Sequence, residues 1–368
     1  MVMQNAELTS EKNGASTNTT LGRRKYLAAV GGTAITTIAG CTGGDDATGD
    51  QVVAAWVMDG SPTDQGWVRS HDEARLSIEE NNDWLTTLSQ EEVSAEESER
   101  VIADFAEEAD IVFTNSAIYE DETAAVAEDF PDTHFENAFG LETRENMSRY
   151  TFKTHEARYA VGVAAGMLTE SDRLGFISGF EIPQVFREAN AFLLGAQSVN
   201  PDATLDVAMT GAFIAQQEST SIVNSWAEDG IDVVTAHANT PATVSAAASN
   251  EIWGTGTFFD QSEAGGDWYV SAILPTWENY YQERCEAVRD ETWESQEFWA
   301  GIADGVVEVG DFGPQVPQDV IDEALEAEEA IATGELDMWE GTQFEGESDE
   351  PGGFIETEMD SYVDGVNT

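Results

Sequence analysis

The sequence predicts an α/β fold with parallel sheets, divided into two lobes. From residue 52 onward, short apolar runs alternate with longer amphipathic segments. This alternation is typical of βαβ units, in which helices cover both faces of a parallel sheet. The apolar runs outnumber the strands of one compact sheet, which usually has about 4–6. We therefore expect two doubly wound α/β lobes.

The first strand is expected at 52–57, before a turn-rich loop that ends near Gly66. The other expected strands are short apolar runs bounded by turn residues, at 111–113, 133–135, 174–177, 205–208, 232–235 and 254–258. Helical periodicity marks the segments between most of them, at 67–80, 95–108, 120–129, 155–167, 183–199, 217–229 and 240–249.

The charge of the chain restricts its partners. Asp and Glu number 72 against 15 Lys and Arg, which gives a formal net charge of −57. Nucleic acid and anionic membrane surfaces are excluded as electrostatic partners, because no basic stripe exists to bind phosphate. A content of 41% hydrophobic residues still supports a folded core. Molar salt screens charge to about 3 Å and makes such self-repulsion tolerable, so we expect a halophilic protein of the haloarchaeal type.

The first forty residues have the features of an export signal. Arg23 and Arg24 precede an apolar stretch at 26–40 that is shorter than the about 20 residues needed to span a bilayer. Twin arginines before such a stretch predict Tat export and a signal peptide at 1–40. Residues 38–41 resemble a lipobox, which implies lipid attachment at Cys41, followed by a flexible tether at 41–51. We expect a protein anchored by lipid at the extracellular face of the cell membrane.

The sequence lacks the usual signatures of catalysis. The four histidines show no metal-ligand spacing, and neither a Gly-x-Ser-x-Gly elbow nor a phosphate-binding loop is present. Gly254 and Gly256 fall within an expected strand, which makes a poor dinucleotide fingerprint. Cys285 is expected to be a small packed side chain in a helix. We expect no metal, no cofactor and no enzymatic activity.

Polar and aromatic residues follow several of the expected strands. Ligands bind beyond the carboxyl ends of the strands in open α/β sheets, so these residues are candidates for one interlobe cleft. Aromatic rings would stack on a flat ligand, and the polar groups would bind its edge. The alternatives are ordinary packing for the aromatic residues, helix capping, turn formation or surface exposure for the polar ones. The candidates are Asp64, Trp67, Asn115, Phe180, His237, Asn239 and Asp260.

Several segments resemble the basic membrane protein (BMP) family of substrate-binding lipoproteins, also called PnrA-like. The first is Asp59-Gly-Ser-Pro-Thr-Asp-Gln-Gly-Trp67, which is similar to the first-loop signature of that family. The similarity covers roughly residues 52–365. Its other segments are 130–136, 156–166, 174–187, 191–201, 299–309 and 359–365.

The resemblance implies a type I periplasmic-binding-protein fold with three hinge crossings and a ligand enclosed by lobe closure. The implied lobes are 52–152 plus 276–308 and 153–275 plus 309–368. The implied partners are a purine base, nucleoside or similar flat heterocycle and the permease of an ABC importer, with the receptor itself a monomer.

By position, Asp64 and Trp67 match the family's first ligand loop, Asn115 its second, and Asp260 the acid after a late strand. The sequence departs from the family in lacking a lysine in its late part, so a free base is as plausible as a nucleoside. A second expected departure is that the acid-rich segment 84–99 replaces the family's usual strand and loop. Ligand sensing, or less favourably a nucleoside-acting enzyme, is the alternative.

Overall fold

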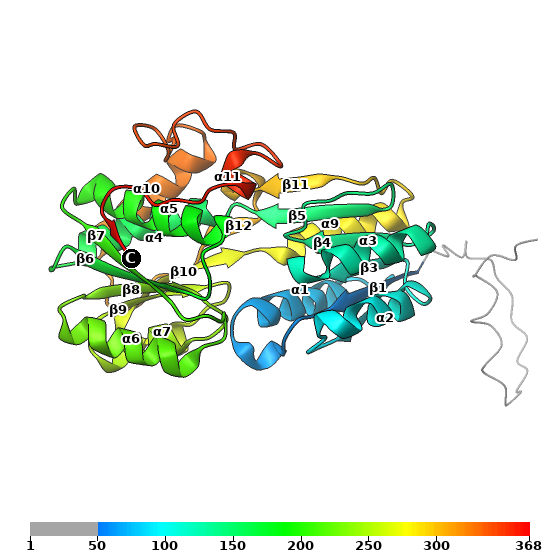
Figure 1. Cartoon of the computed structure of the whole chain (residues 1–368), viewed down its shortest axis with the longest axis horizontal. Coiled ribbons are helices and arrows are strands. Elements are labelled where there is room, and N and C mark those ends of the chain that lie inside the picture. The colour runs from blue at the N-terminus through cyan, green and yellow to red at the C-terminus, as the bar shows by residue number, and fades with distance from the viewer. Residues whose placement is uncertain (1–50) are drawn as a thin grey trace, which may run out of the picture. The chain divides into compact units, whose positions relative to one another are not determined.

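Two parallel sheets, each covered by helices on both faces, make up the described part of the chain (Figure 1). The structure is a computed structural model and describes residues 51–368; of Asp64 it describes only the backbone. The expected signal peptide, Cys41 and the tether before residue 51 lie outside the described residues. Within 51–368 no helix combines the length and apolar character that crossing a bilayer requires.

The sheet of the first lobe has six strands, all parallel, in the order β11-β5-β4-β3-β1-β2. Alternate residues of β1 face opposite layers, since Trp56 packs in the cluster that contains Trp277, whereas Val57 packs with Val101. The pair α1 and α9 therefore covers one face, and α2 and α3 cover the other. The strands are β1 (Val52–Val57), β2 (Leu85–Gln90), β3 (Ile111–Thr114), β4 (His134–Ala138), β5 (Met147–Phe152) and β11 (Glu297–Ala300), and the helices are α1 (Trp67–Asn81), α2 (Ala95–Ala106), α3 (Glu120–Asp129) and α9 (Trp277–Arg289).

The sheet of the second lobe has seven strands in the order β12-β10-β9-β8-β6-β7-β13, parallel except for β12. Its helices α4 and α5 pack closely because glycine on one helix faces the backbone of the other. A Cβ at Gly162 of α4 would lie 2.2 Å from the carbonyl oxygen of Phe192 of α5. The strands are β6 (Arg173–Ser178), β7 (Thr204–Met209), β8 (Val233–His237), β9 (Trp253–Thr257), β10 (Tyr269–Pro275), β12 (Val307–Val309) and β13 (Val366–Asn367). The helices are α4 (Thr154–Leu168), α5 (Pro183–Val199), α6 (Gln216–Glu228), α7 (Ala242–Ser249), α8 (Ser262–Gly265), α10 (Gln318–Ala332) and α11 (Phe354–Thr357).

All seven expected strands and all seven expected helices are present, with ends that differ by at most a few residues. The expectation that 84–99 lacks a strand is wrong, because β2 occupies Leu85–Gln90 and pairs with β1 along its whole length. This strand lies at the sheet edge, where solvent-facing polar residues weaken the apolar signal. The buried strand β5 was missed because its Ser148 and Arg149 find polar partners inside the protein.

The chain passes between the lobes at three places, near Lys153, Thr276 and Gly301. Backbone hydrogen bonds join two of these crossings to nearby strands: Lys153 N–H donates to the carbonyl of Ala300 at 2.7 Å, and Thr276 N–H donates to that of Val306 at 2.9 Å. The lobe boundaries implied by the resemblance stay a proposal. Strand β12, which spans the implied boundary at 308, pairs with β10 in the second sheet.

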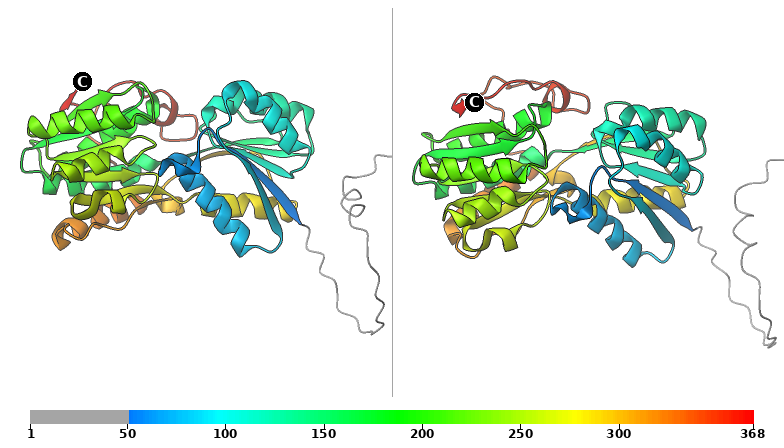
Figure 2. Two further views of the ribbon diagram at one scale, coloured as in Figure 1. Left: turned by 90° about the horizontal axis from the view of Figure 1, so that it is seen from below. Right: turned by 60° about the horizontal axis from the view of Figure 1, so that its bottom comes forward.

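The C-terminal segment contacts both lobes beside these crossings, as the two turned views show (Figure 2). The carboxylate of Glu356, in α11, pairs with buried Arg149 of the first lobe at 2.6 Å. The carbonyl of the same residue accepts a hydrogen bond from Arg187 of the second lobe at 2.8 Å. The segment therefore links the two lobes through one residue.

Glu156 is a titratable group within the hinge. Its carboxylate accepts a hydrogen bond from Ile302 N–H at 2.8 Å, next to the crossing at Gly301. Burial raises the pKa of Glu156 to about 7, and the carboxylates of Asp349 and Asp304 also raise it, while Ile302 N–H and Lys153 oppose the shift. The folded protein therefore binds this proton more tightly than the unfolded chain does.

We expect Glu156→Gln to remove a pH-dependent loss of stability. Because the folded-state pKa is raised from 4.5 to about 7, Glu156 lowers stability as pH rises through that window. A tenfold change in proton affinity corresponds to about 1.4 kcal/mol. The difference in unfolding free energy between Glu156→Gln and wild type should therefore grow across this range and then level. Urea denaturation at a series of pH values in high salt measures it, with exposed Glu283→Gln as the control. A difference that stays flat would contradict the assignment.

Candidate functional site

A cavity of about 240 Å³ lies where the carboxyl ends of strands from both sheets meet. This is the edge at which open α/β sheets hold ligands. The first lobe supplies residues that follow β1, β3 and β4, and the second supplies residues that follow β6, β7, β8 and β9. The lining residues are Asp59, Trp67, Asn115, Ser116, Ala117, Ile118 and Phe139 from the first lobe, and Ile182, Gln184, Phe213, His237, Asn239 and Phe258 from the second.

Aromatic rings from both lobes meet in this cavity. Trp67 is 7% exposed, and its ring centroid lies 5.3 Å from that of Phe139 and 5.2 Å from that of Phe258. The indole N–H of Trp67 donates to the backbone carbonyl of Asn115 at 2.9 Å, which fixes the ring orientation. Trp67 therefore presents a fixed apolar surface that touches the facing lobe.

Two of the phenylalanines have an unusual backbone conformation. Phe139 has φ 57° and Phe258 has φ 65°, in the left-handed region that bulky residues rarely adopt. Each continues a strand ladder, since Phe139 N–H donates to the carbonyl of Tyr150 and Phe258 N–H to that of Ile273. Such strain, of about 1–3 kcal/mol per residue, is concentrated at ligand sites in proteins. Here it directs one ring from each lobe into the cavity.

Two amide groups in the cavity wall lack a partner among the described residues. Asn115 is fully buried; its Oδ1 accepts a hydrogen bond from Asp59 N–H at 3.0 Å, and its Nδ2 binds nothing. Gln184, from the opposite lobe, also has a buried Nε2 without a partner. A buried donor left unpaired costs about 1–3 kcal/mol, so each of these groups gains from a ligand acceptor.

His237 is held from behind by a buried charge cluster. Its Nδ1 lies 3.0 Å from Oε2 of Glu188, which is itself 2.6 Å from Nη2 of Arg158. Both Glu188 and Arg158 are fully buried. Burial by itself would raise the pKa of Glu188, but electrostatic interactions with His237 and Arg158 and the hydrogen bonds to the carboxylate hold this pKa well below its ordinary value.

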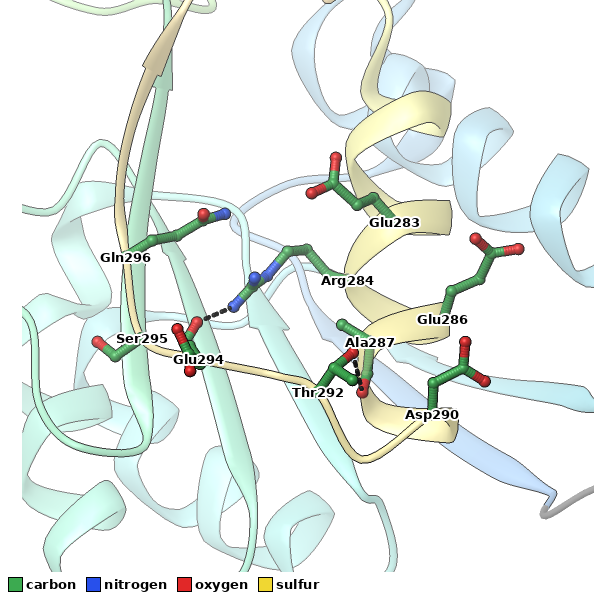
Figure 3. Close-up of a pocket in the computed structure, with 9 residues that line it drawn as sticks. All are labelled: Glu283, Arg284, Glu286, Ala287, Asp290, Thr292, Glu294, Ser295 and Gln296. Carbon is green, nitrogen blue, oxygen red and sulfur yellow. Dashed lines mark hydrogen bonds between the residues drawn. The ribbon is translucent and has the colours of Figure 1, made fainter.

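A second hollow, of about 440 Å³, lies at the end of α9 and has a different character (Figure 3). Its lining includes the carboxylates of Glu283, Glu286 and Asp290. Its one cation, Arg284, is paired with the buried carboxylate of Glu136 and also donates to the carbonyl of Glu294 at 2.8 Å. The guanidinium is already engaged and the walls carry no aromatic ring, so we interpret this hollow as a solvated acidic surface.

The sequence and the fold of this chain match those of known proteins. The model of the family described as ABC transporter substrate-binding protein PnrA-like (Bmp) matches residues 51–339. The chain belongs to this family. It is therefore a substrate-binding protein of an ABC transporter, with a small-molecule ligand and permease subunits as partners. Proteins of this kind act outside the cytoplasm, and they bind and deliver solutes without transforming them.

Two relatives of this chain carry different ligand names. TsgA13 of Haloferax volcanii, named provisionally as an ABC transporter glucose-binding protein, is 37% identical and covers 94% of this chain and 96% of its own. A purine-binding protein of Brucella abortus is 33% identical, over 83% of this chain and 89% of its own.

Solved structures confirm the predicted fold. The solute-binding protein of an ABC transporter system from Conexibacter woesei superposes with a TM-score of 0.67 at 20% identity, over 78% of this chain and 98% of that chain. At this level of identity the comparison supports the fold and does not identify the ligand.

The structure brings together four of the residues predicted from the sequence. Trp67, Asn115, His237 and Asn239 all line the interlobe cavity, and their contact with a ligand stays a prediction. Asp64 lies in the short 3-10 helix Pro62–Asp64.

Two other predicted residues lie outside the cavity lining. Phe180 is 48% exposed and packs edge-on against Phe213, with ring centroids 5.4 Å apart. Asp260 is exposed and accepts hydrogen bonds from the backbone N–H and hydroxyl of Ser262 at 2.9 and 3.1 Å, so its carboxylate is engaged by the turn that leads into α8.

Several lining residues were not predicted from the sequence. Phe139 follows a predicted strand, so its position after that strand was an available signal. The sequence predicts Phe258 as the last residue of a strand and gives no such signal for it. Gln184 lies in the first turn of α5, where the helical pattern gave no reason to single it out. Phe213 follows β7, a strand whose loop was not considered.

The lobes touch beside the cavity, and Gly66 is part of that contact. Gln261 Nε2 donates to the carbonyl of Gln65 across the gap at 3.1 Å. A Cβ added at Gly66 would lie 3.0 Å from Cα and 3.2 Å from the carbonyl carbon of Asn239 in the other lobe. A side chain here would meet backbone, which cannot move aside as a flexible side chain can.

We expect Gly66→Ala to weaken solute binding by opposing closure. Overpacking of this kind costs about 1–3 kcal/mol, and here the cost falls only on the closed arrangement. Calorimetry with the bound solute measures affinity, and small-angle X-ray scattering reports on closure. The matched control is Gly60→Ala, whose added Cβ would meet a side-chain atom of Val68 within one lobe at 3.1 Å. Equal affinities for both variants and wild type would show that the contact does not limit closure.

Proposed function

We propose that this chain is the extracytoplasmic receptor of an ABC importer for a purine-like solute, a base or a nucleoside. The observation that carries the proposal is the cavity wall, in which Trp67 and three phenylalanine rings surround a few unpaired polar groups. Flat heterocycles are bound in this way, by ring contact on their faces and hydrogen bonds on their edges.

The cavity favours a purine over glucose, the two ligands that the names of the relatives suggest. A hexose presents hydroxyl groups around its whole rim, and each needs a hydrogen-bonding partner when water is excluded. The aromatic rings, Ile118 and Ile182 occupy much of the wall and offer none. The volume of about 240 Å³ also lies below the roughly 300–1,000 Å³ of sites for drug-sized ligands, which fits a small solute.

The remaining parts of the proposal rest on sequence. Twin arginines at 23–24 and the lipobox-like segment that ends at Cys41 support Tat export and lipid attachment at the outer face of the membrane. The net charge of −57 supports function in molar salt as a monomer.

Identification of the carried solute tests the proposed function. Residues 42–368 are purified in about 3 M KCl, a concentration at which surface charges are screened. The protein is then denatured, and the released small molecules are identified by mass spectrometry. After refolding, Trp fluorescence is followed during titration with purine bases, nucleosides, riboflavin and glucose. A purine that is released unchanged and binds again supports the receptor. Glucose binding without purine binding overturns the ligand class, and chemical conversion of a nucleoside would favour the enzyme alternative.

We expect Trp67→Ala to reduce purine affinity by about 1–3 kcal/mol, the cost of losing one aromatic–base contact. Trp67→Phe should retain most of the affinity, because a ring surface remains although the hydrogen bond to Asn115 is lost. Isothermal titration calorimetry measures both, with Trp268→Ala in the second lobe as a control outside the cavity. Unchanged affinity in Trp67→Ala would remove this residue from the site.

A further inference from the structure

Arg158, Glu188 and His237 form a buried hydrogen-bonded cluster behind the cavity. Glu188 accepts three hydrogen bonds inside the protein: from Arg158 Nη2 at 2.6 Å, from Thr154 Oγ1 at 2.6 Å, and from His237 Nδ1 at 3.0 Å. An ionised carboxylate has no proton to donate. The proton in the contact between Glu188 and His237 must therefore belong to Nδ1 of the imidazole.

Arg158 keeps this carboxylate ionised and in place. Its guanidinium donates to Thr235 Oγ1 at 2.6 Å and to Thr257 Oγ1 at 3.0 Å, so it is anchored to the two strands β8 and β9 as well as to Glu188. Neither member of the ion pair is exposed to water. If this carboxylate took up a proton, the buried positive charge of Arg158 would be left without a compensating negative charge.

The other nitrogen of His237, Nε2, is on the side of the ring away from Glu188, and the residue lines the cavity. Nδ1 points inward to Glu188, and the residue is 5% exposed. No described residue hydrogen-bonds to Nε2. In the neutral ring the proton on Nδ1 leaves a lone pair on Nε2, which makes this atom an acceptor.

We propose that His237 is a specificity-determining residue that accepts a hydrogen bond from an N–H group of the solute, and that Glu188 and Arg158 are positioning residues that fix its tautomer. The ligand part rests on the proposed function. The site then presents an acceptor at His237 Nε2 and donors at Asn115 Nδ2 and Gln184 Nε2. A heterocycle that carries both an N–H and unprotonated ring nitrogens satisfies all three.

The tautomer is tested without a ligand by ¹⁵N spectra of the imidazole rings from about pH 6 to 9, the range in which histidines titrate. The chain has four histidines, and His237→Phe and His134→Phe identify signals by their loss. The neutral ring of His237 should carry its proton on Nδ1. Oε2 of Glu188 accepts from both Arg158 and His237, so the variant must remove this oxygen. In Glu188→Ala the acceptor for the Nδ1 proton is gone, so the Nε2–H tautomer should gain population. A wild-type ring protonated on Nε2 overturns the positioning role.

The ligand part is tested with adenine, N6,N6-dimethyladenine and 9-methyladenine, each titrated calorimetrically into wild type, His237→Phe and His134→Phe. N6,N6-Dimethyladenine lacks both exocyclic N–H bonds of adenine, and 9-methyladenine lacks its ring N–H. One of them should bind wild type and His134→Phe about tenfold or more weakly than adenine does, because a buried acceptor loses its partner. The same analogue should show little loss in His237→Phe. Equal losses in all three proteins, or no loss with either analogue, overturn the proposal.

Failure of the proposed function gives a different result. If neither adenine nor adenosine binds wild type, the purine receptor and the N–H selection fail together. An Nδ1–H ring in the ¹⁵N spectra would then still support Glu188 as a positioning residue. Should Glu188→Ala not fold, the wild-type spectrum and the His237→Phe titrations decide both parts, since neither requires that variant.

Discussion

Parallel strand pairing is the constraint on which the rest of this structure depends. A parallel pair needs a crossover helix, so every strand of the main ladders enters from one edge and ends at the other. All carboxyl ends of a sheet therefore lie together, and in this chain the two sheets direct those ends at one cavity. Residues as far apart in sequence as Asp59 and Phe258 meet there without any local signal that they are neighbours. The pairing also explains why the site is composed of strand ends, helix starts and the loops between them.

Several of the few basic residues of this acidic chain lie in its interior. Arg149, Arg158, Arg187 and Arg284 are all buried, and three of them form ion pairs with Glu356, Glu188 and Glu136. Molar salt screens the carboxylates on the surface to about 3 Å but screens buried pairs much less. Surface repulsion and internal pairing therefore respond differently to salt. The internal pairs set the position of β5, of α5 and of the C-terminal segment. Their geometry therefore persists in the molar salt that screens repulsion between the surface carboxylates.

Sequence patterns predicted the elements well where burial and hydropathy agree, and poorly where they do not. Strands such as β1 and β6 are apolar and buried, and their limits were close to those observed. Strand β5 is just as buried, yet its Arg149 reads as a surface residue, because the partner Glu356 is more than two hundred positions away. In the site, Trp67 and Asn115 were found from their place after strands. Phe139 and Phe258 depend on left-handed backbone at a strand end, which hydropathy does not encode. Asp260 shows the converse limit, since an acid after a strand binds the backbone of a local turn as readily as it binds a ligand.

The division of the cavity between the lobes makes binding and closure the same event. Asn115 presents its unpaired amide from the first lobe, while the second lobe presents the unpaired amide of Gln184 and the imidazole of His237. A solute bound to one lobe alone would leave the polar groups of the other lobe without a hydrogen-bonding partner. Trp67 contacts Phe258 across the gap, so aromatic contact also favours the closed arrangement before the edge of a ligand is engaged. The hydrogen bonds then decide which solute keeps the lobes together. Selectivity is thus expected to reside in the fixed donors and acceptors of the wall, and affinity in the shared apolar contact.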